Sequence, residues 1–143
     1  MNRIRVIAIC IFRNENKILV AEGFDPVKNQ SFYRPLGGGI EFGEKSAETV
    51  KREIMEEIKA EVTNLDYLGT IENIFVFDGN MGHEIVQVYD GEFVKAHLYQ
   101  QSEILGMEDD ASKFKAVWKE IESFNAGVPL YPDGLQEMLI RLK

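Results

Sequence analysis

Residues 38–60 combine a glycine, several carboxylates and one arginine at fixed spacing, and this set could bind a metal ion beside a phosphate group. The residues, in chain order, are Gly38, Glu44, Arg52, Glu53, Glu56 and Glu57. Magnesium prefers oxygen ligands, so clustered carboxylates together with substrate phosphates suit it. A glycine-rich turn allows the backbone to approach a ligand closely. The segment therefore indicates a divalent metal site next to a diphosphate.

A helix over residues 46–58 would position the carboxylates. Apolar residues recur at helical spacing in this range, at Ala47, Val50, Ile54 and Ile58. At 100° per residue, the three glutamates 53, 56 and 57 fall within an arc of about 100°. A solvated acidic helix face would have the same composition, and its like charges would cost a few tenths of a kcal/mol per pair. For the carboxylates alone the solvated face is the preferred interpretation, and a hard cation bound between them would change that balance.

Each of the residues around the helix could have either a purely structural role or a functional one. The triplet 37–39 could be a plain turn, or a place where the backbone meets a ligand or metal. Glu44 could be a helix N-terminal anion or a partner for Arg52, and Arg52 could be an ordinary surface ion pair. Each feature alone is weak evidence, and it is their joint spacing that indicates a site.

The rest of the chain predicts one α/β domain over residues 1–143. We expect strands, loops and helices in the following order: strands at 6–12 and 17–21, a loop at 23–31, the glycine turn, the helix at 46–58, one or two strands over 62–77, a turn at 78–82, a strand at 84–94, a long loop at 100–113, a short strand at 115–120 and a helix at 133–142. The apolar run at 6–12 is β-branched and continuous, which is typical of a strand covered on both faces.

Composition excludes several classes of protein. The 143 residues include 24 acidic and 16 basic side chains, for a net charge of -8, which argues against broad binding to nucleic acid or an anionic membrane. No apolar run approaches the ~20 residues that span a bilayer. The single cysteine, Cys10, excludes an intrachain disulfide and fits a cytoplasmic location. Arg3 and Arg5 precede an apolar stretch that we interpret as a strand, because no cleavage signal follows it.

The segment 38–60 resembles the Nudix box, the signature of the Nudix (MutT-like) hydrolases. The matching positions are Gly38, Glu44, Arg52, Glu53, Ile54, Glu56 and Glu57. The family usually has glycine where this chain has Lys59, and that glycine ends the helix in a left-handed turn. A lysine should cost about 1 kcal/mol in the same conformation, unless the helix continues past it. The departure concerns the helix end and no metal ligand.

The resemblance implies a fold and an activity. The fold is an α/β/α sandwich with a mixed sheet between helices. The activity is metal-dependent hydrolysis of a diphosphate linkage in a nucleoside diphosphate derivative, such as ADP-ribose, a nucleotide sugar or a nucleoside triphosphate. Two alternatives remain: an RNA 5′-pyrophosphohydrolase, disfavoured by the acidic charge, and a non-catalytic nucleotide sensor, disfavoured by the intact carboxylates. A homodimer is expected by family analogy only.

The resemblance also implies roles for individual residues. Mg²⁺, with Mn²⁺ as the alternative, would bind Glu53, Glu56, Glu57 and the backbone carbonyl of Gly37. Arg52, paired with Glu44, would orient these carboxylates. The general base is either Glu53 or a later acidic residue, and Glu108 is preferred in a group that comprises Glu103, Glu108, Asp109 and Asp110.

Substrate contacts are less well determined by the sequence. Arg34, just before the glycines, would contact a phosphate or form a surface ion pair. Gly38 and Gly39 would let the substrate approach the backbone. Aromatic residues at strand spacing could stack on a base or belong to the core, and they are Phe32, Tyr33, Phe75 and Phe77.

Overall fold

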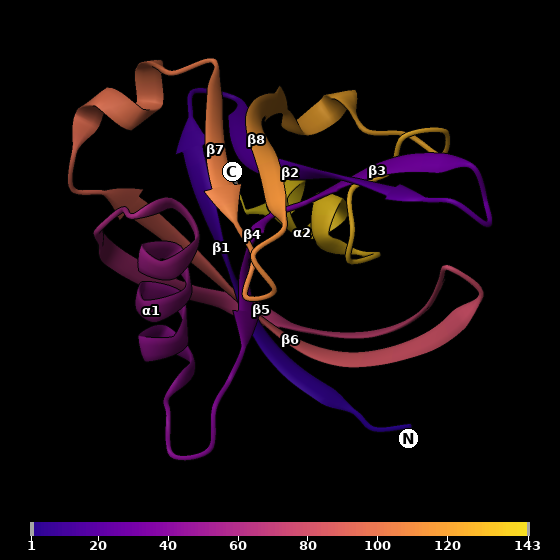
Figure 1. The fold of residues 1–143 in the computed structure, drawn as a ribbon. Helices are drawn as coiled ribbons and strands as arrows, with labels where there is room; N and C mark the ends of the chain where they lie inside the picture. The colour runs from indigo at the N-terminus through magenta and orange to yellow at the C-terminus, as the bar shows by residue number, and fades with distance from the viewer. Residues whose placement is uncertain (1, 143) are drawn as a thin grey trace.

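The computed structural model describes residues 2–142 and has two α-helices packed on a mixed sheet (Figure 1). The strands are β1 (Arg5–Asn14), β2 (Lys17–Asp25), β3 (Gln30–Arg34), β4 (Leu36–Gly39), β5 (Val62–Phe77), β6 (Asn80–Phe93), β7 (Glu103–Met107) and β8 (Lys113–Glu120). The helices are α1 (Ser46–Ile58) and α2 (Leu135–Arg141), with short 3-10 turns η1 (Ala96–Gln100) and η2 (Ile121–Ser123).

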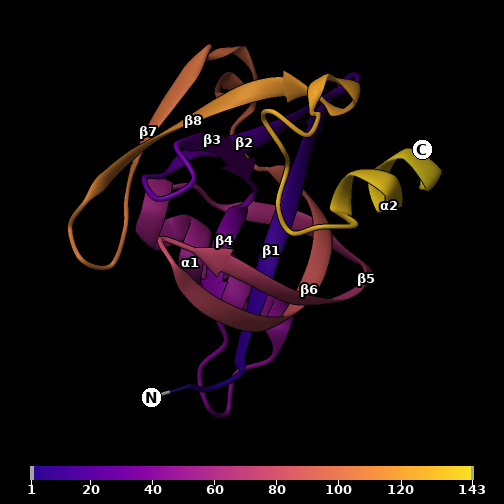
Figure 2. The same cartoon turned by 90° about the vertical axis from the view of Figure 1, so that its right-hand side faces the viewer.

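Strand β1 is the centre of the sheet. It pairs in parallel with β6 and antiparallel with β2 and β4, in the overall order β5-β6-β1-β2-β8-β7, while β3 pairs with β2. In two perpendicular views β1 lies between α1 and α2 (Figures 1 and 2). The expected mixed sheet between helices is thus confirmed. The pairing of β4 with β1 brings the glycine turn against the middle of the sheet.

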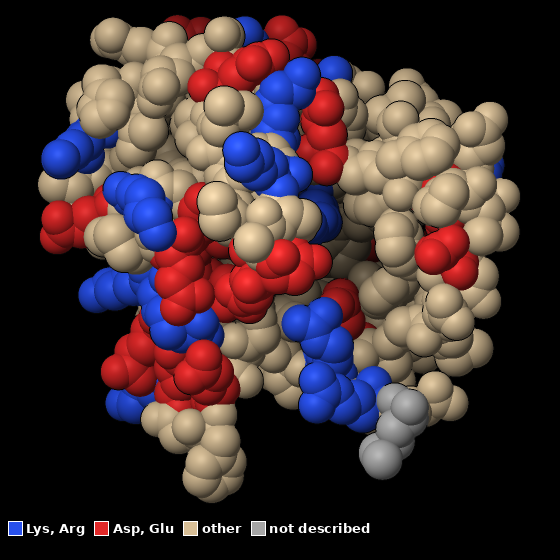
Figure 3. All heavy atoms as spheres, in the orientation of Figure 1, with Lys and Arg blue, Asp and Glu red and all other residues tan. Residues whose placement is uncertain are grey.

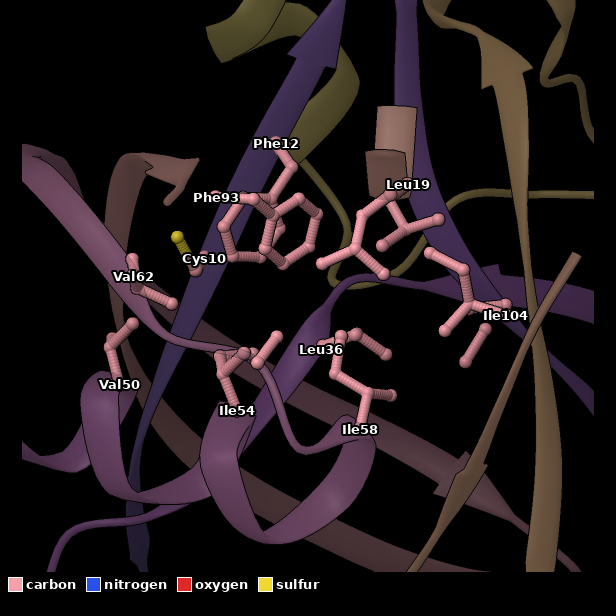
Figure 4. Close-up of a cluster of buried hydrophobic side chains, with 14 of the residues drawn as sticks. Cys10, Phe12, Leu19, Leu36, Val50, Ile54, Ile58, Val62, Phe93 and Ile104 are labelled. Atoms are coloured by element: carbon pink, nitrogen blue, oxygen red, sulfur yellow. The ribbon is translucent and has the colours of Figure 1, made fainter. Parts of the chain in front are cut away.

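The two faces of β1 supply two hydrophobic cores. Ala8, Cys10 and Phe12 face α1, whereas Ile9 and Ile11 face the other side, as the two-residue period of a strand requires. The α1 face is filled from the helix side by the buried residues Val50, Ile54 and Ile58 (Figure 4). Full burial of each such side chain stabilises the fold by about 1.5–3 kcal/mol. This packing fixes the rotation of α1 and hence the direction in which its glutamates point.

Both ends of α1 are defined by hydrogen bonds. At the start, the Glu48 carboxylate accepts the Lys45 backbone N–H at 2.8 Å. At the end, Lys59 adopts the left-handed conformation, with φ 57° and ψ 40°, and its N–H bonds to the Met55 carbonyl at 3.0 Å. The helix therefore stops where a Nudix box helix would stop, although a lysine takes the glycine position.

Two segments expected to be loops contain strands. The prediction for 23–31 was wrong because β2 extends to Asp25 and β3 begins at Gln30, leaving only a tight turn between them. The prediction for 100–113 was wrong because β7 occupies Glu103–Met107. In β7 the outward-facing residues Leu105 and Met107 are exposed yet apolar. The sequence therefore lacks the alternation of apolar and polar residues by which a half-buried strand is recognised.

Other expectations differ less from the structure. Residues 62–77 form one strand, β5, and the last helix begins at Leu135 instead of 133. Cys10 is a buried free thiol whose pKa is raised by burial. Within residues 2–142 there is no helix with the length and apolar character needed to cross a membrane.

Candidate active site

Four of the predicted site residues, Gly39, Arg52, Glu53 and Glu56, line a cleft between the start of β1, the end of β4, helix α1 and the β7–β8 loop. The cleft has a volume of about 650 Å³ and is lined by Arg3, Ile4, Arg5, Val6, Gly39, Ile40, Glu41, Arg52, Glu53, Glu56 and Asp109. Figure 3 shows acidic side chains gathered in the middle of this face, with basic side chains above and below them. A volume of this size suits a small-molecule ligand.

Two glycines are required by their surroundings. A Cβ on Gly38 would lie 2.4 Å from the Glu53 carboxylate carbon, so the absence of a side chain makes room for that carboxylate. Gly37 has φ 154°, and a Cβ there would lie 2.1 Å from the Ala8 carbonyl oxygen. The glycine turn therefore packs against β1 on one side and against the helix carboxylates on the other.

Arg52 links the carboxylates to the glycine turn. Its Nε and Nη2 donate to the two Glu44 oxygens at 2.8 and 2.9 Å, and Nη1 donates to Glu53 at 2.9 Å. Nη2 also donates to the Gly39 carbonyl at 3.0 Å, and Nη1 lies 3.4 Å from Glu56. Bidentate pairing with Arg52 holds the pKa of Glu44 down at about 2. The guanidinium thus restrains the orientation of Glu53 while remaining positively charged.

Three carboxylates from two elements converge at one point. Oxygens of Glu53, Glu56 and Asp109 lie within 4.8 Å of one another. Burial raises the pKa of Glu53, hydrogen bonding to Arg52 opposes this, and the charge of Asp109 raises the pKa further. Close like charges are unfavourable unless a cation neutralises them. The arrangement is therefore suited to a divalent metal.

Glu57 provides a second indication of a cation. The residue is 5% exposed, and its Oε1 is buried with no hydrogen-bond partner among residues 2–142. Burial, followed by the charges of Glu108 and Glu53, raises the pKa of Glu57 to about 9, although the Gly37 backbone N–H donates to this carboxylate. A buried polar atom without a partner is costly. A metal ion that accepted this oxygen as a ligand would remove the cost, so the residues fit such a group.

The loop acids divide into two groups. Asp109 joins the carboxylate cluster, and Glu108 accepts a hydrogen bond from Arg34 Nη2 at 2.7 Å. Glu103 instead pairs with Lys115 at 3.3 Å, and Asp110 accepts hydrogen bonds from Ser112. Asp109 is therefore the loop acid that lies in the carboxylate cluster, and the identity of the general base stays a prediction.

Arg34 is engaged with Glu108, and both side chains are partly exposed. The ion pair that the sequence allowed is therefore present, and contact with a phosphate stays a prediction. Among the aromatic candidates, Phe32 packs edge-on against Phe77 with ring centres 5.9 Å apart, and it also contacts Tyr131. Tyr33 packs against the second core.

Sequence reasoning did not identify Arg3, Arg5 and Glu41 as residues of the cleft. Glu41 lies 3.5 Å from Arg52 and extends the acidic wall. The sequence contained only a weak indication that these residues belong to the site, because two arginines directly before a buried strand are not specific to a binding site. Only the pairing of β1 with β4 shows that this strand start lies next to the glycine turn.

Comparisons with known proteins identify the family of this chain. The family model described as NUDIX domain matches residues 1–134. The NAD-capped RNA hydrolase NudC of Vibrio atlanticus is 31% identical over 95 residues, which cover 66% of this chain and 34% of NudC, so the chain matches about a third of that relative.

Solved structures resemble the whole fold. A MutT NUDIX hydrolase from Burkholderia pseudomallei superposes with a TM-score of 0.68 and 17% identity, covering 99% of this chain and 100% of that one. The E. coli ORF135 protein gives a TM-score of 0.60 with 20% identity, covering 99% and 91%. At these identities the likeness concerns the fold alone.

Proposed function

The chain belongs to the Nudix hydrolase family, and on that premise we propose that it hydrolyses the diphosphate linkage of a nucleoside diphosphate derivative with the help of a divalent metal. The observation that carries the proposal is the convergence of Glu53, Glu56 and Asp109, with oxygens within 4.8 Å of one another in an open cleft. A solvated helix face would neither bury Glu53 to 4% exposure nor recruit an acid from a distant loop.

Glu53, Glu56 and Glu57 would hold the metal, together with the Gly37 carbonyl by family analogy, while Asp109 faces them from the β7–β8 loop. Bound there, Mg²⁺ or Mn²⁺ would supply neutralisation of diphosphate charge and acidification of water. The unpartnered Glu57 Oε1 supports this assignment. The chain's other contributions are made by groups that orient these ligands.

Arg52 is the main orienting residue. Its bidentate pair with Glu44 anchors the guanidinium, and its Nη1 then fixes one oxygen of Glu53. Because Arg52 also donates to the Gly39 carbonyl, it ties helix α1 to the glycine turn that faces the substrate. A shift of about 1 Å in such a group can cost a hundredfold in rate.

The proton acceptor is assigned to the carboxylate cluster. Glu53 and Asp109 lie in it, and the raised pKa of Glu53 moves this group toward the range useful for a base near neutral pH. Glu108, the loop residue preferred from the sequence, is held by Arg34. We therefore place Asp109 ahead of Glu108 among the loop acids.

A second candidate function is hydrolysis of a diphosphate that is attached to RNA. NudC, which is similar to part of this chain, is named for the hydrolysis of NAD-capped RNA. A dinucleotide joined by a diphosphate is compatible with the same carboxylate cluster. The net charge of -8 counts against a long RNA track, so the exclusion of nucleic acid stays a prediction.

The test is a substrate panel incubated with Mg²⁺ or Mn²⁺, with products resolved by mass spectrometry. The panel contains ADP-ribose, nucleotide sugars, nucleoside triphosphates, NAD, NAD-capped RNA and 5′-triphosphorylated RNA. We expect cleavage within the phosphate chain of at least one small molecule. Binding of nucleotide without any turnover would instead indicate the sensor, and turnover of RNA alone would indicate the RNA-directed alternative.

A further inference from the structure

Arg3 and Arg5, which form the basic wall of the cleft, line it together with the carboxylates and have no role in the mechanism above. Arg5, at the start of β1, lies over Gly39, with Nη2 only 3.5 Å from the position that a Cβ on this glycine would occupy. Gly39 belongs to the glycine turn whose carbonyl is bound by Arg52. Arg5 thus reaches the same turn as Arg52.

Arg5 contacts a polar chain that runs into the sheet. Glu84 on β6 is the direct neighbour of Arg5 in the parallel pairing, and its Oε2 lies 3.4 Å from Arg5 Nη1. The Glu84 side chain is only 15% exposed and is hydrogen-bonded to Asn73, which is 7% exposed, on the adjacent strand β5. Burying this polar pair costs free energy, and the pair limits the freedom of Arg5 at the cleft.

Both arginines retain unused donors. A guanidinium has five N–H donors, and Arg5 spends one on a long contact while its side chain stays 51% exposed. Arg3 is exposed and forms no ion pair within the described part of the chain. By contrast, Arg52 is occupied by Glu44, Glu53 and Gly39. The wall therefore offers two positive charges to an anion.

We propose that Arg5 and Arg3 form a subsite for a terminal phosphate, so that the enzyme prefers substrates with three or more phosphates over diphosphates that end in a sugar. This specificity rests on the proposed function. A terminal phosphate carries close to two negative charges at neutral pH, which matches two guanidiniums. Arginine binds phosphate through paired N–H donors, and Glu84 acts as a positioning residue for Arg5.

The test compares ATP with ADP-ribose, which share the adenosine diphosphate portion and differ in the terminal phosphate. For Arg5→Gln we expect the KM for ATP to rise about tenfold, with kcat and the KM for ADP-ribose changed less than about twofold. Arg141→Gln on α2, which removes the same charge outside the cleft, should change neither. Equal effects of Arg5→Gln on both substrates, or no effect on either, would overturn the proposal.

Glu84→Gln tests the positioning role. It should raise the KM for ATP in the parent protein and have no further effect in the Arg5→Gln background, because Glu84 acts through Arg5. An undiminished effect in that background would contradict the role. Melting temperatures of all variants separate these effects from loss of folding.

A binding measurement keeps the subsite testable if no nucleotide is hydrolysed. By calorimetry with Mg²⁺, inorganic tripolyphosphate should bind about tenfold more tightly than pyrophosphate, and Arg5→Gln should remove the difference. Equal affinities in the parent protein would overturn the subsite even if hydrolysis of ADP-ribose upheld the proposed function. Preferential tripolyphosphate binding without turnover of any substrate would uphold the subsite and contradict the proposed function.

Discussion

The buried carboxylate of Glu57 makes the stability of the metal-free protein depend on pH in an unusual direction. Its pKa in the folded protein is raised to about 9, against an ordinary value of 4.5. When the pKa of a group is higher in the folded than in the unfolded protein, its contribution to stability is complete at pH values below the unfolded-state pKa. This contribution is lost as the pH rises to the folded-state pKa. Between these limits the native state holds one proton more than the unfolded state.

One extra proton corresponds to a fall in the free energy of unfolding of about 1.4 kcal/mol per pH unit. From pH 6 to pH 8 the loss from Glu57 alone is about 3 kcal/mol, and the raised pKa of Glu53 acts in the same direction. For a domain of this size that is a fall of about 8 °C in melting temperature. The lowered pKa of Glu44 acts only near pH 2–4.5, outside this window.

The assay is urea denaturation at pH 6, 7 and 8 in EDTA, with the parent, Glu57→Gln and the exposed control Glu61→Gln. In Glu57→Gln the free energy of unfolding should depend much less on pH than in the parent. In Glu61→Gln the dependence on pH should be the same as in the parent. Added Mg²⁺ should stabilise the parent more at pH 8 than at pH 6, because metal ligands must be deprotonated. A parent whose stability does not change with pH, or an unchanged slope in Glu57→Gln, would refute the reasoning.

Three further predictions concern the box and its loop. Lys59→Gly should raise the free energy of unfolding by about 0.5–1 kcal/mol in urea titrations, because glycine relieves the left-handed strain at φ 57°; a loss of stability would contradict this. Gly38→Ala should lower kcat/KM about a hundredfold while the protein stays folded by circular dichroism, because its Cβ would displace the Glu53 carboxylate; near-normal activity would show that this close approach is unimportant. Asp109→Asn should reduce kcat about a hundredfold, whereas Glu108→Gln should mainly alter KM; the reverse ranking in steady-state kinetics would reassign the base to Glu108.

Helix α1 could be predicted from sequence because local signals agree there. Apolar residues recur at helical spacing within a few positions of one another, and the expected range 46–58 is the observed one. The Arg52–Glu44 pairing, which the resemblance to the Nudix box implied, is present. The sequence allowed two outcomes at Lys59, a left-handed residue that ends the helix or a helix that continues past it. Packing of the helix against the sheet decides between them.

Features that depend on contacts between distant segments could not be predicted. β7 is an edge strand whose outward residues are apolar, so its period is masked. Which loop acid reaches the helix depends on the path of the β7–β8 loop, where Ala111 has φ 68° and Asp110 turns back to Ser112. Arg5 enters the cleft only because β1 pairs with β4. Local sequence carries no signal for such contacts.

In the proposed function, the carboxylate cluster on α1 performs metal-dependent diphosphate hydrolysis. The most direct measurement is turnover of the best panel substrate by the parent, Glu53→Gln and Glu61→Gln at saturating Mg²⁺, with all three confirmed to be folded. We expect a loss of about a hundredfold or more in kcat for Glu53→Gln and parent-like turnover for Glu61→Gln. Parent-like turnover by Glu53→Gln, or full activity of the parent in EDTA, would contradict it.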